Sequence, residues 1–428
     1  MPGVDVVELC RDLLRIDTSN PGSDERAAAA YIAGHLAAAG IEHQVFEPAP
    51  GRLNILSVMP GGEAGLPRLA LHGHLDVVPA DPAGWTHPPF AGEVAGGLLY
   101  GRGAVDMKGF VAMMLALQLQ LAASGRRPRR DLVFCYLADE ETGSLHGARW
   151  LAERRPDLLE GVTEAIGEVG GFSVALPGGG RAYTIQTAER GSLWFSIKVP
   201  GVAGHAALSG APNPVRRLGP LIERLNALTV AEEPPAAFGA LCRQVAALTG
   251  GPADDPERLL APLGVFGYAA LRGRRTDFVP TQALAGRAPN YNVIPAVAEL
   301  GVDCRYLPGG RERARRALES VLEPDMTYEM PATTLEAEAP AEGPLLEAAL
   351  AAIRAHDPEC RALLPYVLPA GTDAAALATL GIHCYGFTPL PLPEGFDYPA
   401  MFHAVDERVP LESLHQGQQI LATFATGY

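Results

Sequence analysis

The first part of the chain alternates between helical and extended hydrophobic patterns. Apolar residues recur at helical spacing from Val6 to Leu14, and a second helix is expected between a cap at Ser23 and Gly40. Short apolar runs bounded by turn residues predict buried strands at roughly 41–47, 52–59, 68–75, 131–138 and 164–167. Strands that alternate with helices in this way indicate an α/β domain with a mostly parallel sheet.

The pattern changes after the glycine-rich segment Pro177-Gly178-Gly179-Gly180, which is typical of a linker. Beyond it, strands and helices of a small α+β unit are expected at roughly 182–189, 192–199, 214–228, 282–288, 297–306, 311–322 and 325–331. The Pro- and Ala-rich stretch that begins at Val230 is expected to be mostly loop, with some helix. The α/β alternation resumes at Leu345. We therefore expect a discontinuous α/β domain formed by residues 1–180 and 337–428, with a smaller domain inserted at 181–336.

Composition narrows the classes of function. A length of 428 residues agrees with two or more domains, and a net charge of −15 argues against nucleic acid or an anionic membrane as the main partner. No apolar run is long enough to span a bilayer, and the N-terminus lacks the features of a signal peptide, so a cytoplasmic location is expected. The six cysteines are scattered and form no CxxC pair, which fits reduced thiols packed in cores. Any metal would therefore rely on histidines and carboxylates.

Polar residues interrupt the hydrophobic pattern where strands end. The first case is His74-Leu75-Asp76, which closes an apolar run. Residues two apart on a strand point to the same face, so His74 and Asp76 are expected side by side. Such a histidine can bind a metal through one ring nitrogen while the carboxylate accepts a hydrogen bond from the other. A hydrogen-bonded pair without a metal is the alternative.

Further acids and one more histidine follow other strands or turns, namely Asp106, Glu140, Glu141, Glu168 and His403. Open α/β sheets bind ligands at the carboxyl ends of their strands, and imidazole together with carboxylate suits zinc or a similar divalent ion. The set is too large for one tetrahedral site, but two metals that share a bridging carboxylate would use all of it. Each residue also has a structural alternative, such as a helix cap at Asp106 or first-turn acids at Glu140 and Glu141.

The turn at Gly101-Arg102-Gly103 raises the question of a phosphate loop. The segment lacks the third glycine of a dinucleotide fingerprint and the Gly-Lys-Ser/Thr of a P-loop. A nucleotide site is therefore disfavoured.

Eight segments, taken together, resemble a family of co-catalytic zinc amidohydrolases. The family includes aminoacylase, acetylornithine deacetylase, succinyl-diaminopimelate desuccinylase and the glutamate carboxypeptidases. The matching segments are HGHLDVVP, GRGAVDMKG, LADEETG, GEVGG, GVAGHAAL, NVIPAVAELGVDCRYLPG, GTDAA and FHAVDERV. They follow the order of the family and span nearly the whole chain.

The resemblance implies a zinc-peptidase catalytic domain, discontinuous in sequence, with an inserted ferredoxin-like domain that serves as a lid and in dimerisation. It implies two Zn²⁺ per subunit, with Co²⁺ or Mn²⁺ as possible substitutes. Glu140 resembles the general base, and Asp76 the partner that orients a ligand histidine. The residues that resemble metal ligands are His74 and Glu168 on the first metal, Glu141 and His403 on the second, and Asp106 as the bridge, followed by a cis peptide bond to Met107.

The resemblance also assigns roles outside the metal cluster. His205 lies in Gly204-His205-Ala206, where alanines replace the usual serines of the family motif. In the family this histidine reaches into the partner subunit's active site and helps to hold the oxyanion, which implies a homodimer, or a lid motion in a monomer. Asn292 and Arg305 resemble contacts to the substrate carboxylate, which a guanidinium binds well, and Gly371 resembles a backbone contact to the substrate. For Arg305, the alternative is an ordinary surface ion pair.

The sequence thus predicts a dizinc hydrolase that cleaves an amide beside a free carboxylate, in an N-acyl amino acid or a short peptide. It leaves a deacylase and a peptidase both open. A non-catalytic, metal-stabilised binding or scaffold protein with the same fold is the alternative from another class.

Overall fold

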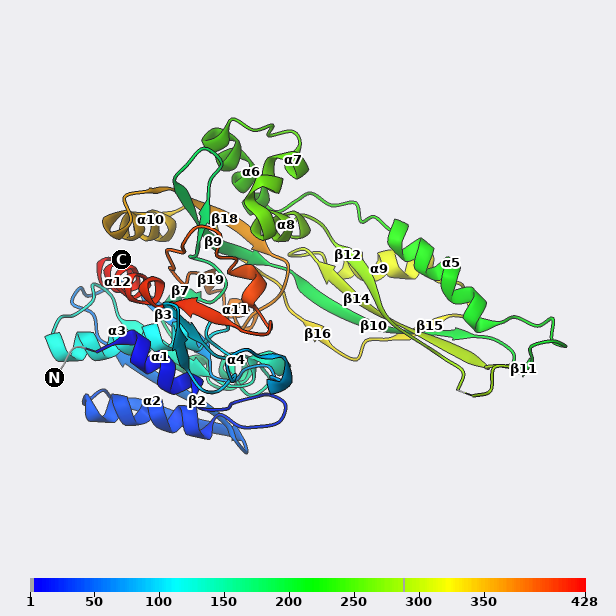
Figure 1. Ribbon diagram of the computed structural model, residues 1–428, viewed down its shortest axis with the longest axis horizontal. Coiled ribbons are helices and arrows are strands. Elements are labelled where there is room, and N and C mark those ends of the chain that lie inside the picture. Colours follow the sequence, from blue (N-terminus) through cyan, green and yellow to red (C-terminus); the bar gives the residue numbers. More distant parts are fainter. Residues whose placement is uncertain (1–3, 288) are drawn as a thin grey trace.

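A compact body and an elongated arm make up the computed structural model, which describes residues 4–287 and 289–428. Figure 1 shows both ends of the described chain in the body, while the arm projects from it on one side. Two predictions involve residues outside the described part of the chain. The N-terminal segment, in which no signal peptide was predicted, includes residues 1–3, and the strand predicted at 282–288 includes residue 288.

A ten-stranded sheet forms the centre of the body. Along its main path lie β1 (His43–Ala49), β2 (Arg52–Met59), β6 (Leu132–Leu137), β3 (Arg68–His74), β7 (Val162–Gly167), β19 (His383–Gly386), β9 (Arg181–Glu189) and β17 (Ala337–Glu338). Two further strands, β8 (Ser173–Ala175) and β18 (Cys360–Leu368), pair with β9.

The sheet is mixed, so the prediction of a mostly parallel sheet is only partly right. The parallel pairs are β6–β3, β3–β7, β7–β19 and β9–β18. The pairs β1–β2 and β2–β6 are antiparallel. Only Pro50 and Gly51 separate β1 from β2, and a connection this short can join only antiparallel strands.

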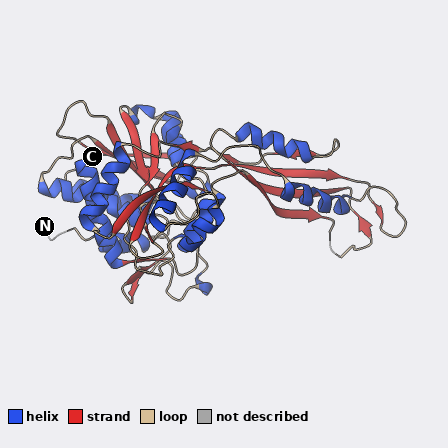
Figure 2. Cartoon of the chain, turned by 90° about the horizontal axis from the view of Figure 1, so that it is seen from above, coloured by secondary structure: helices blue, strands red, loops and turns tan. Residues whose placement is uncertain are grey.

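Helices cover both faces of the sheet (Figure 2). One face packs against α1 (Val6–Leu14), α2 (Arg26–Ala38), α3 (Lys108–Ser124), α10 (Pro344–His356) and α12 (Leu411–Gly427). The other packs against α4 (Ala148–Arg154) and α11 (Ala374–Ala378). Helix α3 is buried along nearly its whole length, which explains why its sequence is apolar on every side. In the described ranges, none of the helices combines the length and the hydropathy that a membrane span requires.

The arm is a second layered unit with its own core. Its antiparallel sheet has the order β12 (Asp277–Ala285), β14 (Val297–Tyr306), β10 (Gly191–Pro200) and β15 (Thr327–Glu329), and β16 (Thr333–Thr334) also pairs with β10. Helices α5 (Pro214–Ala227) and α9 (Arg311–Val321) pack on this sheet. The element sequence and strand order are those of a ferredoxin-like fold, as predicted. A short ladder of β11 (Gly204–His205) and β13 (Val293–Ile294) lies at the tip.

The boundaries of the arm differ from the predicted 181–336. Strand β9 belongs to the large sheet, and its residues are buried on both faces rather than alternating, so the arm begins at β10. The stretch that begins at Val230 also returns to the body. Its three helices, α6 (Ala236–Thr249), α7 (Pro256–Leu260) and α8 (Gly264–Arg272), share the large core of the body, where α6 and α8 lie against β18.

A small antiparallel sheet of β4 (Glu93–Ala95), β5 (Leu98–Tyr100) and β20 (Arg408–Pro410) lies beside the body. It joins the loop before α3 to the loop before α12. Single turns of 3-10 helix complete the body, at Pro82–Gly84, Glu140–Thr142, Pro156–Leu159, Ala261–Leu263 and Pro399–Met401.

Candidate functional site

The predicted acids and histidines of the body lie together. His74 ends β3, Glu140 and Glu141 form the turn after β6, and Glu168 follows β7. Because β6, β3 and β7 are parallel neighbours, their carboxyl ends meet at one edge of the sheet. Asp106, in the loop before α3, and His403, in the loop before β20, complete the set, which we call the cluster (His74, Asp106, Glu140, Glu141, Glu168 and His403).

Asp106 lies between the two histidines of the cluster. Its Oδ1 is 3.1 Å from His74 Nε2, and its Oδ2 is 3.1 Å from His403 Nε2. A glutamate approaches the same nitrogen of each histidine: Glu168 Oε2 is 3.6 Å from His74 Nε2, and Glu141 Oε2 is 3.3 Å from His403 Nε2. This is the arrangement that a carboxylate shared by two metals requires. The predicted cis peptide bond between Asp106 and Met107 is present.

The donor atoms of the cluster fit divalent metals. Two ligands at 2.0–2.1 Å from a tetrahedral Zn²⁺ lie about 3.3 Å apart, close to the distances above. Ligand atoms also gather within 4.8 Å of one another in two groups, His74 with Glu140 and Glu168, and His74 with Asp106 and Glu141. A cavity lies beside the cluster, and its described lining residues include no lysine or arginine. The four carboxylates of the cluster therefore lack a cationic side chain there to balance their charge, and bound metal ions would balance it.

The electrostatics of the metal-free cluster show the same excess of negative charge. Burial and repulsion by Glu168 raise the pKa of Glu140 well above that of an ordinary glutamate. Burial likewise raises the pKa of Glu168 to about 8. Hydrogen bonds to Asp106 and Glu141 raise the pKa of His403 to about 10. For His74, burial opposes the charged form, but the charge of Glu168 and the hydrogen bonds to Asp106, Asp76 and Glu168 together outweigh it and raise the pKa well above 6.5. Without metal, the cluster therefore retains protons at neutral pH.

Asp76 contacts His74 differently from the prediction. The Nδ1 of His74 is 2.9 Å from the main-chain carbonyl oxygen of Asp76, and 3.5 Å from its carboxylate. Because a carbonyl can only accept, this contact places the proton on Nδ1 and leaves Nε2 free to bind a metal. The buried carboxylate of Asp76 instead accepts from the backbone N–H groups of Glu140, at 3.1 Å, and Glu141, at 3.2 Å. It thus fixes the turn that presents both glutamates.

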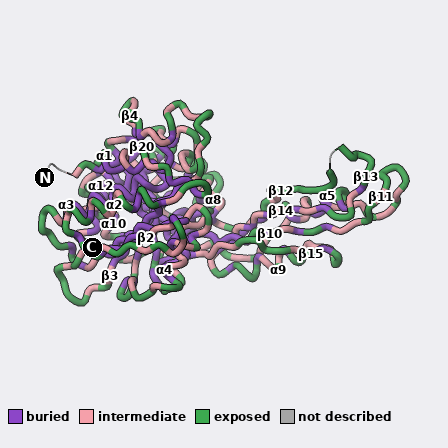
Figure 3. Tube along the Cα trace, turned by 90° about the horizontal axis from the view of Figure 1, so that it is seen from below, coloured by how far each residue is buried: buried purple, intermediate pink, exposed green. Residues whose placement is uncertain are grey.

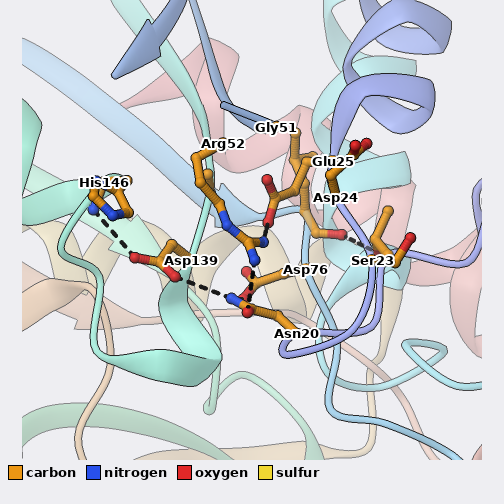
Figure 4. Close-up of polar contacts among 12 residues, drawn as sticks. Asn20, Ser23, Asp24, Glu25, Gly51, Arg52, Asp76, Asp139 and His146 are labelled. Carbon is orange, nitrogen blue, oxygen red and sulfur yellow. Dashed lines mark hydrogen bonds and ion pairs between the residues drawn. The ribbon is translucent and has the colours of Figure 1, made fainter. Parts of the chain in front are cut away.

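Asn20 is a residue of the site that the sequence did not single out. Its side-chain amide donates to Asp76 at 2.9 Å, to Asp139 at 3.0 Å and to Thr142 at 2.9 Å. Its oxygen accepts from Arg52 at 2.9 Å, and Arg52 in turn pairs with the buried Glu25 (Figure 4). The sequence around Asn20 reads only as a helix-breaking turn, because nothing local reveals that this side chain is buried.

Glu407 is the second such residue. Its buried carboxylate accepts from the backbone N–H groups of Gly103, at 3.0 Å, Val105, at 2.7 Å, and Asp106, at 3.0 Å, and from Arg102 at 2.6 Å. The Gly103 amide and the Arg102 side chain of this turn thus bind a carboxylate of the protein itself. Glu407 ties the loop of Asp106 to the loop that carries His403, and so fixes the two relative to each other.

The predicted residues of the arm lie away from the cluster. His205 and Asn292 are together at the exposed tip, with the Nδ2 of Asn292 3.5 Å from the Nε2 of His205. Figure 1 shows this tip, at β11, at the end of the arm farthest from the body. Arg305 lies at the other end of β14, and its Nε donates to both oxygens of Asp303 at 3.0 Å. This is the ion pair given above as the alternative to substrate binding. None of the three lines the cavity.

A cavity of about 340 Å³ opens beside the cluster. Five members of the cluster line it, namely Asp106, Glu140, Glu141, Glu168 and His403. Gly371 also lines it, as expected of a residue that contacts substrate. The remaining walls are mostly apolar and come from β18, from α8 and from the segment 399–403.

The fold is that of a metallopeptidase. It combines a discontinuous α/β body, an inserted ferredoxin-like arm and metal-donor groups at the carboxyl edge of the sheet. Residues 70–427 match peptidase family M20/M25/M40, and the chain belongs to that family.

The relatives with similar sequences include succinyl-diaminopimelate desuccinylases. The one from Rhodopseudomonas palustris (strain BisA53) is 36% identical over 233 residues, which cover 52% of this chain and 57% of that protein. This chain thus spans a little over half the length of that relative. The one from Methylocella silvestris is 30% identical over 455 residues and covers 99% of this chain and 97% of its own.

Solved structures share the fold at lower identity. The M20 family metallo-carboxypeptidase Sso-CP2 from Sulfolobus solfataricus has a TM-score of 0.72 at 16% identity, with 98% of both chains covered. Human carnosine dipeptidase 1 has a TM-score of 0.68 at 17% identity, with 98% of this chain and 96% of that chain covered. These likenesses extend over the body and the arm together.

Proposed function

We propose that this protein is a metal-dependent hydrolase that cleaves the amide bond of N-acyl amino acids or short peptides with a free carboxylate. The observation that carries the proposal is the cluster itself. It combines a shared carboxylate, Asp106, with a glutamate, Glu140, in the wall of one cavity. The names of the relatives support amide substrates of both kinds, an acylated amino acid and a dipeptide.

Two metal ions would be held by His74, Glu168 and Asp106 on one side, and by Asp106, Glu141 and His403 on the other. We expect Zn²⁺, with Co²⁺ or Mn²⁺ as substitutes, because imidazole and carboxylate donors suit these ions. Their contribution would be Lewis acidity, which polarises the substrate carbonyl and makes a water molecule more acidic.

Glu140 is the residue that would move the proton. Asp76 fixes its backbone, while its carboxyl group lines the cavity next to the metal ligands. In this position the carboxylate accepts a proton from the attacking water and then donates it to the nitrogen of the departing amine. Burial, which raises the pKa of Glu140 in the metal-free cluster, would favour the second of these steps by helping the carboxyl group to keep the proton until the amine leaves.

His205 and Asn292 would complete the active site of a second copy of the chain. Both side chains are exposed at the tip of the arm, and no element of the body lies near them in Figure 1. A homodimer in which each tip enters the partner's cavity would bring a histidine and an amide to the developing oxyanion. Arg305 and Gly371 would contact the substrate, Arg305 after release from Asp303.

Metal analysis combined with a substrate panel tests this proposal. The panel contains N-acetyl amino acids and unmodified dipeptides, so that deacylase and peptidase activities are separated. We expect about two metal ions per chain and hydrolysis of at least one compound class. Bound metal without turnover on any compound would instead favour a binding or scaffold protein with this fold.

A further inference from the structure

Aromatic rings from several parts of the chain converge on one side of the cavity. Phe266 of α8 packs edge-on against Tyr366 of β18, with ring centroids 5.3 Å apart, and against Phe172, at 6.0 Å. Phe172 continues to Tyr398 at 5.0 Å, and Tyr398 to Phe402 at 5.5 Å, next to His403. These five rings, which we call the aromatic wall, form a chain of contacts from Tyr366 to Phe402, and all of them except Tyr398 line the cavity.

Outside the cluster, the walls of the cavity are mostly apolar, and their described side chains include no charged group. Apolar side chains line most of them, namely Val169, Phe172, Phe266, Ala269, Tyr366, Leu368, Pro369, Ala370, Pro399 and Phe402. The hydroxyl of Tyr366 already donates to the carbonyl oxygen of Val169 at 2.7 Å. Every charged side chain among the described lining residues belongs to the cluster.

These surroundings decide which half of the substrate fits. The carboxylate of the amino-acid half needs a cation or several donors, and the residues predicted to supply them, Asn292 and Arg305, lie on the arm. A second carboxylate against these walls would meet apolar side chains and no lysine or arginine among the described lining residues. The cavity therefore suits an uncharged acyl half.

We propose that this cavity binds an apolar acyl group, such as a branched aliphatic or aromatic acyl chain, and that Phe266 and Ala269 of α8 set its size and polarity. This inference rests on the proposed function. It separates this chain from the succinyl group in the names of its relatives, because succinyl ends in a carboxylate. It also gives a role to the helices between 236 and 272, which bring α8 to the cavity.

The test compares acyl groups on one amino acid, chosen as the best substrate among the N-acetyl compounds. The series is acetyl, butanoyl, hexanoyl and benzoyl, with 4-methylpentanoyl and succinyl as a pair of equal shape that differ only in the terminal carboxylate. We expect kcat/KM to rise about fourfold per buried methylene until the cavity is full. The succinyl compound should be slower than the 4-methylpentanoyl compound by a factor on the order of 100.

Two lysine variants on the same helix sharpen the test. Ala269 lines the cavity, whereas Tyr268 is 65% exposed and does not. Ala269→Lys should place a cation where an acyl carboxylate would lie and improve succinyl relative to 4-methylpentanoyl by about tenfold or more. Tyr268→Lys adds the same charge outside the cavity and should leave the ratio unchanged. Circular dichroism would confirm that both variants fold.

The outcomes separate the inference from the proposed function. Succinyl cleaved as fast as 4-methylpentanoyl, or cleavage only of dipeptides with a charged acyl half, would overturn the assignment of the cavity and leave the hydrolase intact. An equal change of the ratio in both lysine variants would also overturn it. Failure of the metal-loaded protein to cleave any compound would overturn the proposed function itself.

Discussion

The two places where the chain concentrates candidate chemistry have opposite surroundings. The cluster lies in the body, where neighbours hold its groups: His74 is fully buried and contacts three carboxylates. At the tip of the arm, His205 is exposed, and among the described residues the one side chain within hydrogen-bond distance of its ring is the amide of Asn292, at 3.5 Å. Figure 3 shows the contrast, with buried residues gathered at the centre of the body and mostly exposed residues at the tip.

The two regions differ in whether their candidate groups are held in place by their own chain. The groups of the cluster are oriented by hydrogen bonds within one chain, so each chain carries all of the proposed metal ligands and the proposed base. At the tip, β11 pairs only with the two-residue strand β13 among the described strands, and the side chains of His205 and Asn292 are exposed. A role for His205 in catalysis would therefore need a second chain or a lid motion, whereas a role for Glu140 would need neither.

The largest effect is expected from Glu140→Ala. Loss of the proton carrier should lower kcat by about 10²–10⁴-fold. Metal content should remain, because Glu141, His74 and the other proposed ligands are untouched. Turnover and metal content measured on the same sample give the result, and a variant with normal rates would exclude Glu140 as the base.

His205→Ala should lower kcat by about 10²–10³-fold, the usual cost of removing one oxyanion donor. The decisive measurement mixes this variant with Glu140→Ala under conditions that exchange subunits. In a mixed dimer, one site has both defects and the other has neither. Random mixing of inactive parents should therefore restore about a quarter of the wild-type activity.

The mixture also separates the two models of His205. If the histidine acts within its own chain through a lid motion, every chain in the mixture remains defective and no activity returns. Asn292→Ala can replace His205→Ala as the partner in the mixture, because its side chain lies at the same tip. A monomer at all concentrations in sedimentation would contradict the dimer directly.

The sequence was sufficient to predict the residues of the cluster, but not to predict which strands belong to the body and which to the arm. His74, Glu140, Glu141 and Glu168 follow apolar strands, and strand ends in parallel order must meet at one edge. The assignment of β9 failed because β9 and β10 are separated by Arg190 alone, and local pattern cannot tell which sheet each strand joins. Helix α8 was missed as a wall of the cavity because an apolar helix reveals its face only once its partner is known.

The residues that hold the cluster in place were the hardest to predict. Asn20 and Glu407 act through burial and through hydrogen bonds to residues far away in sequence, and neither property can be read from neighbouring residues. Asp76 was placed correctly on the face of His74, but the ring N–H donates to its main-chain carbonyl oxygen, at 2.9 Å, rather than to its carboxylate, which lies at 3.5 Å. Spacing predicts the side on which a residue lies, but not which of its oxygens makes the bond.

Asp76→Ala sharpens the comparison within the body. The variant keeps the carbonyl that contacts His74 and removes the carboxylate that holds the amides of Glu140 and Glu141. Metal affinity should fall by about 10–100-fold, as for other partners of ligand groups, without complete loss of metal. Titration with a competing chelator measures the change. Complete loss of the metals would mean that Asp76 is itself a ligand, and Asp303→Ala on the arm is a control that should leave the affinity unchanged.

The smallest expected effect is a pH dependence of the stability that metal binding adds, which should arise from the cluster in the body. In the metal-free protein, the pKa of Glu168 is raised from 4.5 to about 8 and that of His403 from 6.5 to about 10. The folded cluster therefore binds more protons than the unfolded chain between these limits, so the free energy of unfolding falls as pH rises. Metal must displace these protons, and its affinity should rise about tenfold per pH unit for each proton released. Thermal unfolding at pH 6, 7 and 8, with and without a chelator, should show a gap in Tm that widens by a few degrees with pH. A gap that is independent of pH would show that the metals do not bind where these protons are held.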